Sequence, residues 1–151
     1  MITGRDIIVT VVAVCATIAA VALAQGPGKP IMKSSVFDWD SFKVESKNFG
    51  AMRQCFSART ATLDLLDCHI TTLNPGQAPH APHHHPEEEL LIVKEGTLEV
   101  MQNGVTNHAS AGSMIFQASN ELHGVRNTGQ VPVTYYVIKW VSPGMLKNSA
   151  P

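Results

Sequence analysis

The most informative segment of the chain reads His80-Ala-Pro-His-His-His-Pro-Glu-Glu-Glu-Leu-Leu-Ile-Val-Lys-Glu-Gly96. Successive side chains of a β-strand point to opposite faces, so odd-numbered residues share one side. If extended structure holds over residues 83–93, one face carries His83, His85 and Glu89, followed by two apolar side chains. The segment therefore predicts a metal-binding niche at the mouth of a hydrophobic barrel.

Two imidazoles and one carboxylate suit a first-row divalent metal and leave coordination positions open. The best candidate for a fourth ligand is His123, within residues 112–127, which read as a strand, a turn and a second strand. His69 and His108 lack such a setting and are interpreted as ordinary strand and turn residues. The remaining polar residues of the segment are interpreted as solvent-facing or as partners that orient a ligand: His84, Glu87 and Glu88.

A solvated histidine-rich tract that binds metal adventitiously is the competing interpretation of this segment. It accounts for the histidines but not for the glutamate four residues after His85, nor for the pattern around His123.

The pattern resembles the two motifs of the cupin superfamily. The first family motif is a Gly, about five residues, His-x-His, three or four residues, Glu, six residues and Gly; the second is Gly, five residues, Pro-x-Gly, two residues, His, three residues and Asn. The chain matches the first with Gly76, His83, His85, Glu89 and Gly96, and the second with Gly112, Ala118, Asn120, His123 and Asn127. The spacer before His83 is one residue longer, and Ala118 and Asn120 replace Pro and Gly in the turn, where Asn tolerates left-handed backbone angles.

The resemblance covers roughly residues 60–141 and implies an all-β fold, the antiparallel double-stranded β-helix (jelly-roll, or cupin barrel). It also implies one divalent transition metal ion (Mn, Fe, Zn, Ni, Co or Cu) held by His83, His85, Glu89 and His123, and a small-molecule ligand in the barrel. Cupins commonly form homodimers through a sheet, for which the outward-facing Leu90 and Ile92 are suited. Packing of these two residues under a second sheet is the alternative.

The rest of the chain supports an all-β domain over residues 35–145. Residues 35–50 predict an N-terminal strand or arm with aromatic anchors, and no stretch after residue 30 has helical periodicity. Short apolar or alternating runs follow, separated by turn residues that include the hairpin pair Asn103-Gly104. These runs are 63–73, 90–94, 97–101, 113–117 and 133–141.

Residues 1–24 have the features of a secretory signal peptide: Arg5 near the start, an apolar run, and a small-x-small end at Ala22-Leu-Ala24. Residues 25–34 then read as a flexible linker rich in Gly, Pro and Lys. We therefore expect an exported protein, periplasmic or extracellular, with cleavage after Ala24 and no stable membrane span afterwards. The alternative is an uncleaved N-terminal membrane anchor.

Net charge and cysteine content limit the partners and covalent links that we expect. The formal net charge is −1, which gives no electrostatic footprint for nucleic acid. Cys55 and Cys68 form an even pair beyond the signal segment, so an oxidising compartment permits a disulfide; two separate buried thiols are the alternative.

Three functions remain open. The leading hypothesis is a metal-dependent enzyme, of isomerase, lyase or dioxygenase type, acting on a small polar or carbohydrate-derived substrate. The second is a non-catalytic binding or sensing module that binds its ligand through the metal. The third is a structural role, in which the metal acts as a staple that only stabilises the fold. The candidates for moving protons or orienting a substrate are Tyr135, Tyr136, His80, Gln117 and Arg53.

Overall fold

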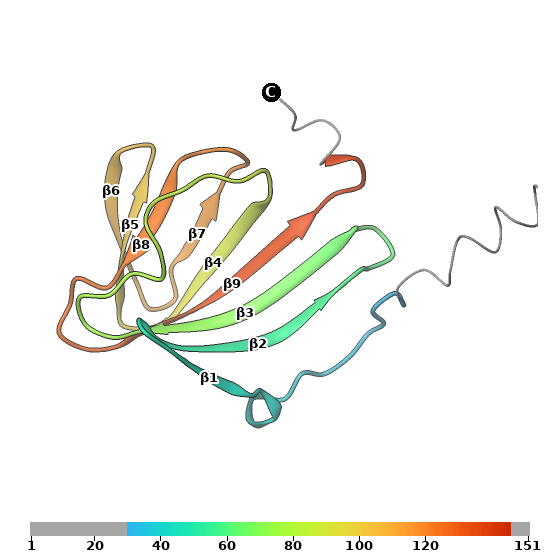
Figure 1. The fold of residues 1–151 in the computed structure, drawn as a ribbon, viewed down its shortest axis with the longest axis horizontal. Coiled ribbons are helices and arrows are strands. Elements are labelled where there is room, and N and C mark those ends of the chain that lie inside the picture. The colour runs from blue at the N-terminus through green and yellow to red at the C-terminus, as the bar shows by residue number, and fades with distance from the viewer. Residues whose placement is uncertain (1–29, 146–151) are drawn as a thin grey trace, which may run out of the picture. The chain divides into compact units, whose positions relative to one another are not determined.

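The computed structural model describes residues 30–145, which form two antiparallel β-sheets (Figure 1). Six strands lie in the larger sheet in the order β1-β2-β3-β9-β4-β7, and three in the smaller in the order β6-β5-β8. The strands are β1 (Val44–Lys47), β2 (Gly50–Ala58), β3 (Leu65–Leu73), β4 (Glu88–Glu95), β5 (Thr97–Gln102), β6 (Val105–Ser110), β7 (Met114–Gln117), β8 (His123–Arg126) and β9 (Val133–Val141). Within the described residues, no helix is long and apolar enough to cross a membrane.

The core lies between the two sheets and follows from strand alternation. Odd-numbered residues of β4 and β9 face inward, because Leu91, Val93, Val133, Tyr135 and Val137 are all buried in one cluster. The smaller sheet adds three further buried side chains to that cluster: Leu98, Val100 and Ala109. The predicted all-β architecture, a double-stranded β-helix, is confirmed.

Two turns depend on asparagines in the left-handed region. Asn103 (φ 48°) and Gly104 (φ 83°) form the two-residue connection between β5 and β6, as the hairpin signal predicts. Asn120 has φ 59° in the turn before β8, where the cupin motif has Gly. Asparagine tolerates this backbone conformation better than most residues, so the substitution preserves the turn.

The strand predictions were least complete where a strand is polar. β6 is an edge strand of which only Ala109 is buried, and β2 mixes polar and apolar residues around a register shift between Gln54 and Phe56. Neither strand therefore stands out as an apolar run.

The expected extension over residues 83–93 was also wrong in its first half. Strand β4 begins at Glu88, and residues 81–87 form a loop with one isolated bridge at His83. Pro82 and Pro86 explain the difference, since proline has no N–H to donate to a ladder.

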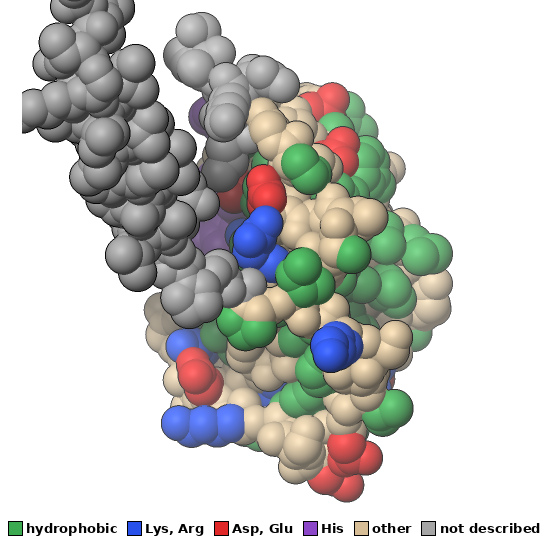
Figure 2. Space-filling model, turned by 90° about the vertical axis from the view of Figure 1, so that its right-hand side faces the viewer, with side chains coloured by type: hydrophobic (Ala, Val, Ile, Leu, Met, Phe, Trp, Pro, Cys, Tyr) green, Lys and Arg blue, Asp and Glu red, His purple; other side chains and the backbone are tan. Residues whose placement is uncertain are grey.

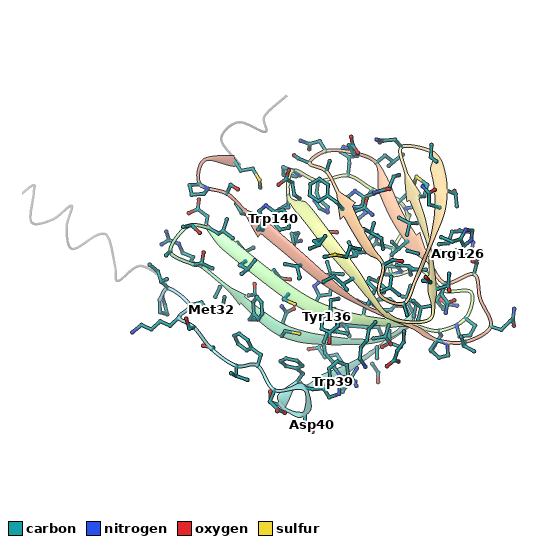
Figure 3. The ribbon with its side chains drawn as sticks, turned by 180° about the vertical axis from the view of Figure 1, so that it is seen from behind. Met32, Trp39, Asp40, Arg126, Tyr136 and Trp140 are labelled. Carbon is teal, nitrogen blue, oxygen red and sulfur yellow. The ribbon has the colours of Figure 1, made fainter. Side chains whose placement is uncertain are left out.

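The N-terminal arm packs on the outside of the larger sheet. Ile31 bridges to Arg59, and the ring of Phe37 lies 4.7 Å from that of Phe56. Trp39 lies in a short 3-10 helix (Trp39–Ser41), labelled with its neighbour Asp40 in Figure 3. The aromatic anchors expected over residues 35–50 are therefore present in the arm.

Candidate metal centre

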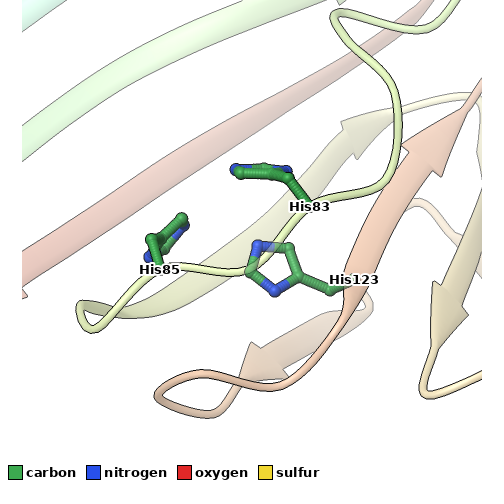
Figure 4. Close-up of side chains that lie close together, drawn as sticks. All are labelled: His83, His85 and His123. Atoms are coloured by element: carbon green, nitrogen blue, oxygen red, sulfur yellow. The ribbon is translucent and has the colours of Figure 1, made fainter. Parts of the chain in front are cut away.

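Three histidines converge at one point of the described domain. His83 and His85 lie on the loop before β4, and His123 is the first residue of β8 (Figure 4). One ring nitrogen from each lies within 4.8 Å of the others, a separation that one metal ion can bridge. The convergence predicted from the two motifs is therefore present.

Backbone hydrogen bonds bring the two motifs together. The amide nitrogen of His83 donates to the carbonyl oxygen of His123 at 3.0 Å, and the amide of His123 donates back to the carbonyl of His83 at 2.9 Å. The amide of Asn120 also donates to the carbonyl of His85 at 2.8 Å, so the turn before β8 fixes the second loop histidine as well. The β5–β8 ladder places His123, and backbone pairing between the two motifs positions His83 and His85 against it.

The tautomer of His123 and the lowered pKa of His83 both suit metal binding. His123 Nδ1 lies 2.8 Å from the carbonyl oxygen of Glu121, which can only accept, so this nitrogen carries the proton and Nε2 is left as a lone-pair donor. Burial lowers the pKa of His83 to about 4, with added contributions from His80, His123, His85 and Lys139. A neutral imidazole at neutral pH is the form that binds metal.

Buried nitrogens without partners test whether an ion fits. Within residues 30–145, His83 Nδ1, His85 Nδ1 and His123 Nε2 are buried and form no hydrogen bond. Glu87 Oε2 lies 3.3 Å from His85 Nδ1, but without hydrogen-bond geometry. Such groups are costly to bury unpaired, and all three belong to the rings that converge at the centre, where a divalent ion would bind imidazole nitrogens. The residues present fit one metal ion.

Glu89 lies beside the three histidines rather than among them. Its Oε1 is 3.3 Å from His85 Nε2, and the group of mutually close donors contains only the histidines. The side chain is on the inward face of β4 and is largely buried, which keeps it within reach of the centre. Glu88 faces the opposite side, where its Oε2 accepts from Trp140 Nε1 at 3.1 Å, and His84 is exposed.

A cavity of about 440 Å³ adjoins the histidines. Of the five residues proposed for proton transfer or substrate orientation, His80, Gln117 and Tyr135 line it. Tyr136 faces outward on β9 (Figure 3), and Arg53 places its guanidinium 4.9 Å from the Trp39 ring centroid. These last two do not line the cavity, because one lies on the wrong face of β9 and the other is held by the N-terminal arm.

Gln117 presents a fixed donor to the cavity. Gln102 Nε2 donates to the carbonyl of Phe116 at 2.7 Å and to Gln117 Oε1 at 2.9 Å. A carbonyl accepts only, so this network identifies which atom of each amide is nitrogen. Gln117 Nε2 is buried without a partner among the described residues, next to Glu89 in the β4–β7 register. It is therefore available to an oxygen atom at the site.

His69 corrects an expectation, because this residue lines the cavity and is not an ordinary strand residue. Its Nδ1 lies 3.2 Å from Asp67 Oδ2, and Asp67 Oδ1 accepts from Gln54 Nε2 at 3.0 Å. The Asp-x-His spacing on one strand face was the available signal in the sequence. His108, in contrast, is exposed on β6 as expected, with Nε2 3.8 Å from Glu99.

Tyr135 lines the same cavity as His69 and is buried, with 2% of its surface exposed. Burial raises the pKa of its hydroxyl well above the usual range, against a smaller opposing effect of a hydrogen bond with Thr71. The phenol therefore stays protonated at neutral pH and acts as a hydrogen-bonding group, not as a phenolate base.

Comparison with known proteins agrees with this architecture. Residues 69–139 match the family described as the cupin domain. This matched segment contains all three histidines and Glu89. The fold is that of a cupin. No curated protein matches the sequence.

Several solved structures resemble the chain at low sequence identity. An RmlC-like cupin from Shewanella frigidimarina has 17% identity and a TM-score of 0.59, covering 72% of this chain and 93% of its own. A predicted oxalate decarboxylase from Thermotoga maritima has 19% identity and a TM-score of 0.57, with 71% and 99% covered. A polyketide cyclase from Streptomyces resistomycificus has 19% identity and a TM-score of 0.58, with 73% and 80% covered. At these identities the similarity shows the cupin fold alone.

Proposed function

We propose that this cupin-fold protein is a metal-dependent enzyme that acts on a small polar or carbohydrate-derived substrate in its cavity. One divalent transition metal ion is held by His83, His85 and His123, with Glu89 as the fourth ligand. The observation that carries the proposal is that one ring nitrogen from each of His83, His85 and His123 lies within 4.8 Å of the others. Within residues 30–145, each of the three rings also has one buried nitrogen that forms no hydrogen bond.

Side chains of this chain supply the remaining chemistry. When bound, the ion supplies Lewis-acid polarisation of a substrate oxygen, or oxygen activation if it is iron. Gln117 Nε2 and the Tyr135 hydroxyl orient oxygens of the substrate. His69, fixed by Asp67, takes or returns a proton at its Nε2, because an ionised carboxylate can only accept and keeps the other proton on Nδ1.

The cavity wall favours an enzyme over a purely ligand-gripping module. A binding module needs no titratable group beyond the metal ligands, whereas this cavity is lined by His69, Lys139 and Tyr135. Two of the structurally similar proteins are named as enzymes, a predicted oxalate decarboxylase and a polyketide cyclase. Non-catalytic, metal-assisted ligand binding is the alternative, and turnover of no substrate in a broad screen of the metal-loaded protein would favour it.

Metal content after loading tests the centre. The protein is loaded with Co²⁺, desalted and measured by elemental analysis and d–d absorption. We expect one ion per chain in the wild type, and loss of the ion in His83→Ala and His123→Ala. His84→Ala and His108→Ala are matched controls, because these histidines are exposed and lie outside the converging group.

Glu89→Gln tests the fourth ligand separately. A weaker but still stoichiometric ion with an altered d–d spectrum supports Glu89 as a ligand. Equal cobalt content in the wild type and in His83→Ala would show that the ion is not held at this centre and would defeat the proposal.

The structural-staple interpretation makes a different prediction. A closed coordination sphere excludes solvent, whereas the adjoining cavity implies exchangeable water on the ion. Water-proton relaxation of the Mn²⁺-loaded protein separates the two, since only an open site enhances it.

We further propose export, with cleavage after Ala24, and assembly into a homodimer. Residues 1–24 lie outside the described residues, so export rests on the sequence pattern. Mass analysis of the protein recovered from its own cell envelope tests it: a chain starting at Gln25 supports cleavage, and an intact N-terminus supports the membrane-anchored alternative.

A further inference from the structure

A row of three charged side chains crosses the larger sheet beside the cavity, and two of them, Glu89 and Lys139, line it. Across the larger sheet Glu89 of β4 pairs with Lys139 of β9, and Lys139 pairs with Asp67 of β3. Residues paired in register point to the same face. Glu89 and Lys139 both line the cavity, so the row faces inward and not toward solvent.

Lys139 is the member of this row without an ionic partner. Glu89 lies at 3.3 Å from His85 Nε2, while the two oxygens of Asp67 are used by Gln54 and His69. Among residues 30–145, no ion pair joins Lys139 to either neighbour. The other lysine at the cavity, Lys47, is paired with Glu45 at 2.8 Å.

The charge of the loaded cavity is therefore positive. Three neutral imidazoles add nothing, and Glu89 and Asp67 offset the divalent ion, which leaves the Lys139 ammonium uncompensated. A cation at a concave, partly apolar site attracts an anion more strongly than one on an open surface. An ammonium binds a carboxylate through charge-assisted hydrogen bonds.

The rest of the wall describes the body of that anion. Side chains without polar atoms form much of the lining, namely Phe49, Met52, Leu91, Val125 and Val137. Such a surface suits methylene or ring carbons, and the polar groups lie at the histidine end and along the Lys139 row.

We propose that the cavity takes a small organic acid whose carboxylate binds Lys139 and whose other polar end lies at the three-histidine centre. His69 lies on the neighbouring strand, next to Asp67, and lines the same cavity. Its neutral Nε2 can only accept, so Lys139 alone supplies the charged contact to the carboxylate. The inference deepens the proposed function by naming its ligand class, and it rests on the metal centre for the second end of the ligand.

Titration calorimetry at pH 7 tests the subsite with two probes of one shape. Succinate carries two carboxylates, and succinamide carries two neutral amides on the same carbon frame. Both are titrated into Co²⁺-loaded and metal-free protein. The variants are Lys139→Met, which removes the charge, Lys139→Arg, which keeps it, and the control Lys43→Met, whose lysine is exposed and does not line the cavity.

We expect Lys139→Met to weaken succinate binding about tenfold or more, and to leave any binding of succinamide, which has no carboxylate, nearly unchanged. Lys139→Arg should recover part of the affinity, and Lys43→Met should match the wild type. Circular dichroism of each variant confirms that the fold is retained.

Three outcomes overturn the subsite: no succinate binding to the wild type in either form, unchanged succinate affinity in Lys139→Met, or equal losses for both probes. Failure of the wild type to load Co²⁺ contradicts the proposed metal centre instead. In that case, a succinate affinity of the metal-free protein that depends on Lys139 still supports the anion subsite.

Discussion

His83 and His123 are joined by two reciprocal backbone hydrogen bonds, 3.0 and 2.9 Å long, although they belong to different motifs of the chain. The bridge places the loop that carries His83 directly on the first residue of β8. The geometry of the metal centre therefore depends on how closely the loop can approach this strand.

Gly124 permits that close approach. A Cβ atom at this position would lie 3.2 Å from both Cα and Cγ of Pro82, so an added methyl group pushes the loop away. We expect Gly124→Ala to weaken Co²⁺ binding about tenfold, as displaced supporting groups do at metal sites, with the fold retained. Competition with a coloured chelator measures it. Gly129→Ala is the control, and equal affinities of the two variants would contradict the close-approach argument.

The Asp67–His69 pair predicts one imidazole tautomer. Asp67 accepts at 3.2 Å from Nδ1, so neutral His69 carries its proton on Nδ1. Nitrogen-detected NMR should report this tautomer in the wild type and a shift toward the Nε2–H form in Asp67→Leu. His108, whose nearest carboxylate oxygen lies 3.8 Å from Nε2, serves as an internal reference. An unchanged His69 spectrum in Asp67→Leu would remove the basis for its role in proton transfer.

Replacing Asn127 should cost much of the stability of the fold, because its side chain is buried and fully hydrogen-bonded. Its side chain is fully buried, donates to the carbonyls of Leu73 and Val131 at 3.0 and 2.8 Å, and accepts from the amide of Gly129 at 3.0 Å. Asn127→Leu leaves these backbone groups unpaired, so we expect the free energy of unfolding to fall by about 3 kcal/mol. Urea denaturation measures it, with the exposed Asn107→Leu as control. A loss of less than about 1 kcal/mol would mean that water replaces the amide.

The two cysteines predict a pH dependence. They are free thiols beside the register shift between β2 and β3, and burial raises the pKa of Cys68 to about 12, with smaller contributions from Cys55 and Asp67. The native state then holds its proton at pH values where the unfolded thiol, with an ordinary pKa of 9.0, has lost it. This contribution to stability is complete below pH 9 and is lost as the pH rises toward 12. The midpoint temperature of thermal unfolding should therefore fall less steeply between pH 8 and pH 11 in Cys68→Ala than in the wild type.

A thiol-labelling experiment separates the free pair from a disulfide. Iodoacetamide at pH 8 should leave Cys68 unmodified in the native protein and should label both thiols after denaturation without reductant. A requirement for reductant would mean that the two residues are bridged in the isolated protein.

The outward face of β4, β7 and β9 predicts the homodimer contact. Phe116 is 51% exposed and its ring stacks 6.4 Å from that of Trp140. Figure 2 shows hydrophobic side chains in green along the right-hand edge of the described domain. Sedimentation should give a dimer for the wild type and a monomer for Phe116→Glu. Val105→Glu, on the exposed edge strand β6, is the control, and a monomeric wild type would contradict the interface.

Much of this protein can be predicted from residue order. Alternation of side chains predicted the inward face of β4, and the Asn103-Gly104 pair predicted its hairpin, because both depend on a few neighbouring residues. The spacing of His83, His85 and His123 predicted the centre, since ligand types at fixed intervals are a local pattern.

The tertiary structure decided what depends on register between distant strands. Lys139, His69 and Gln117 reach one cavity only because β9, β3 and β7 pair at particular offsets, which local patterns do not encode. Arg53 and Tyr136, equally plausible by residue type, face elsewhere for the same reason. A shift of one residue in any of these ladders would move its side chains to the opposite face, so the cavity depends on long-range pairing and not on composition.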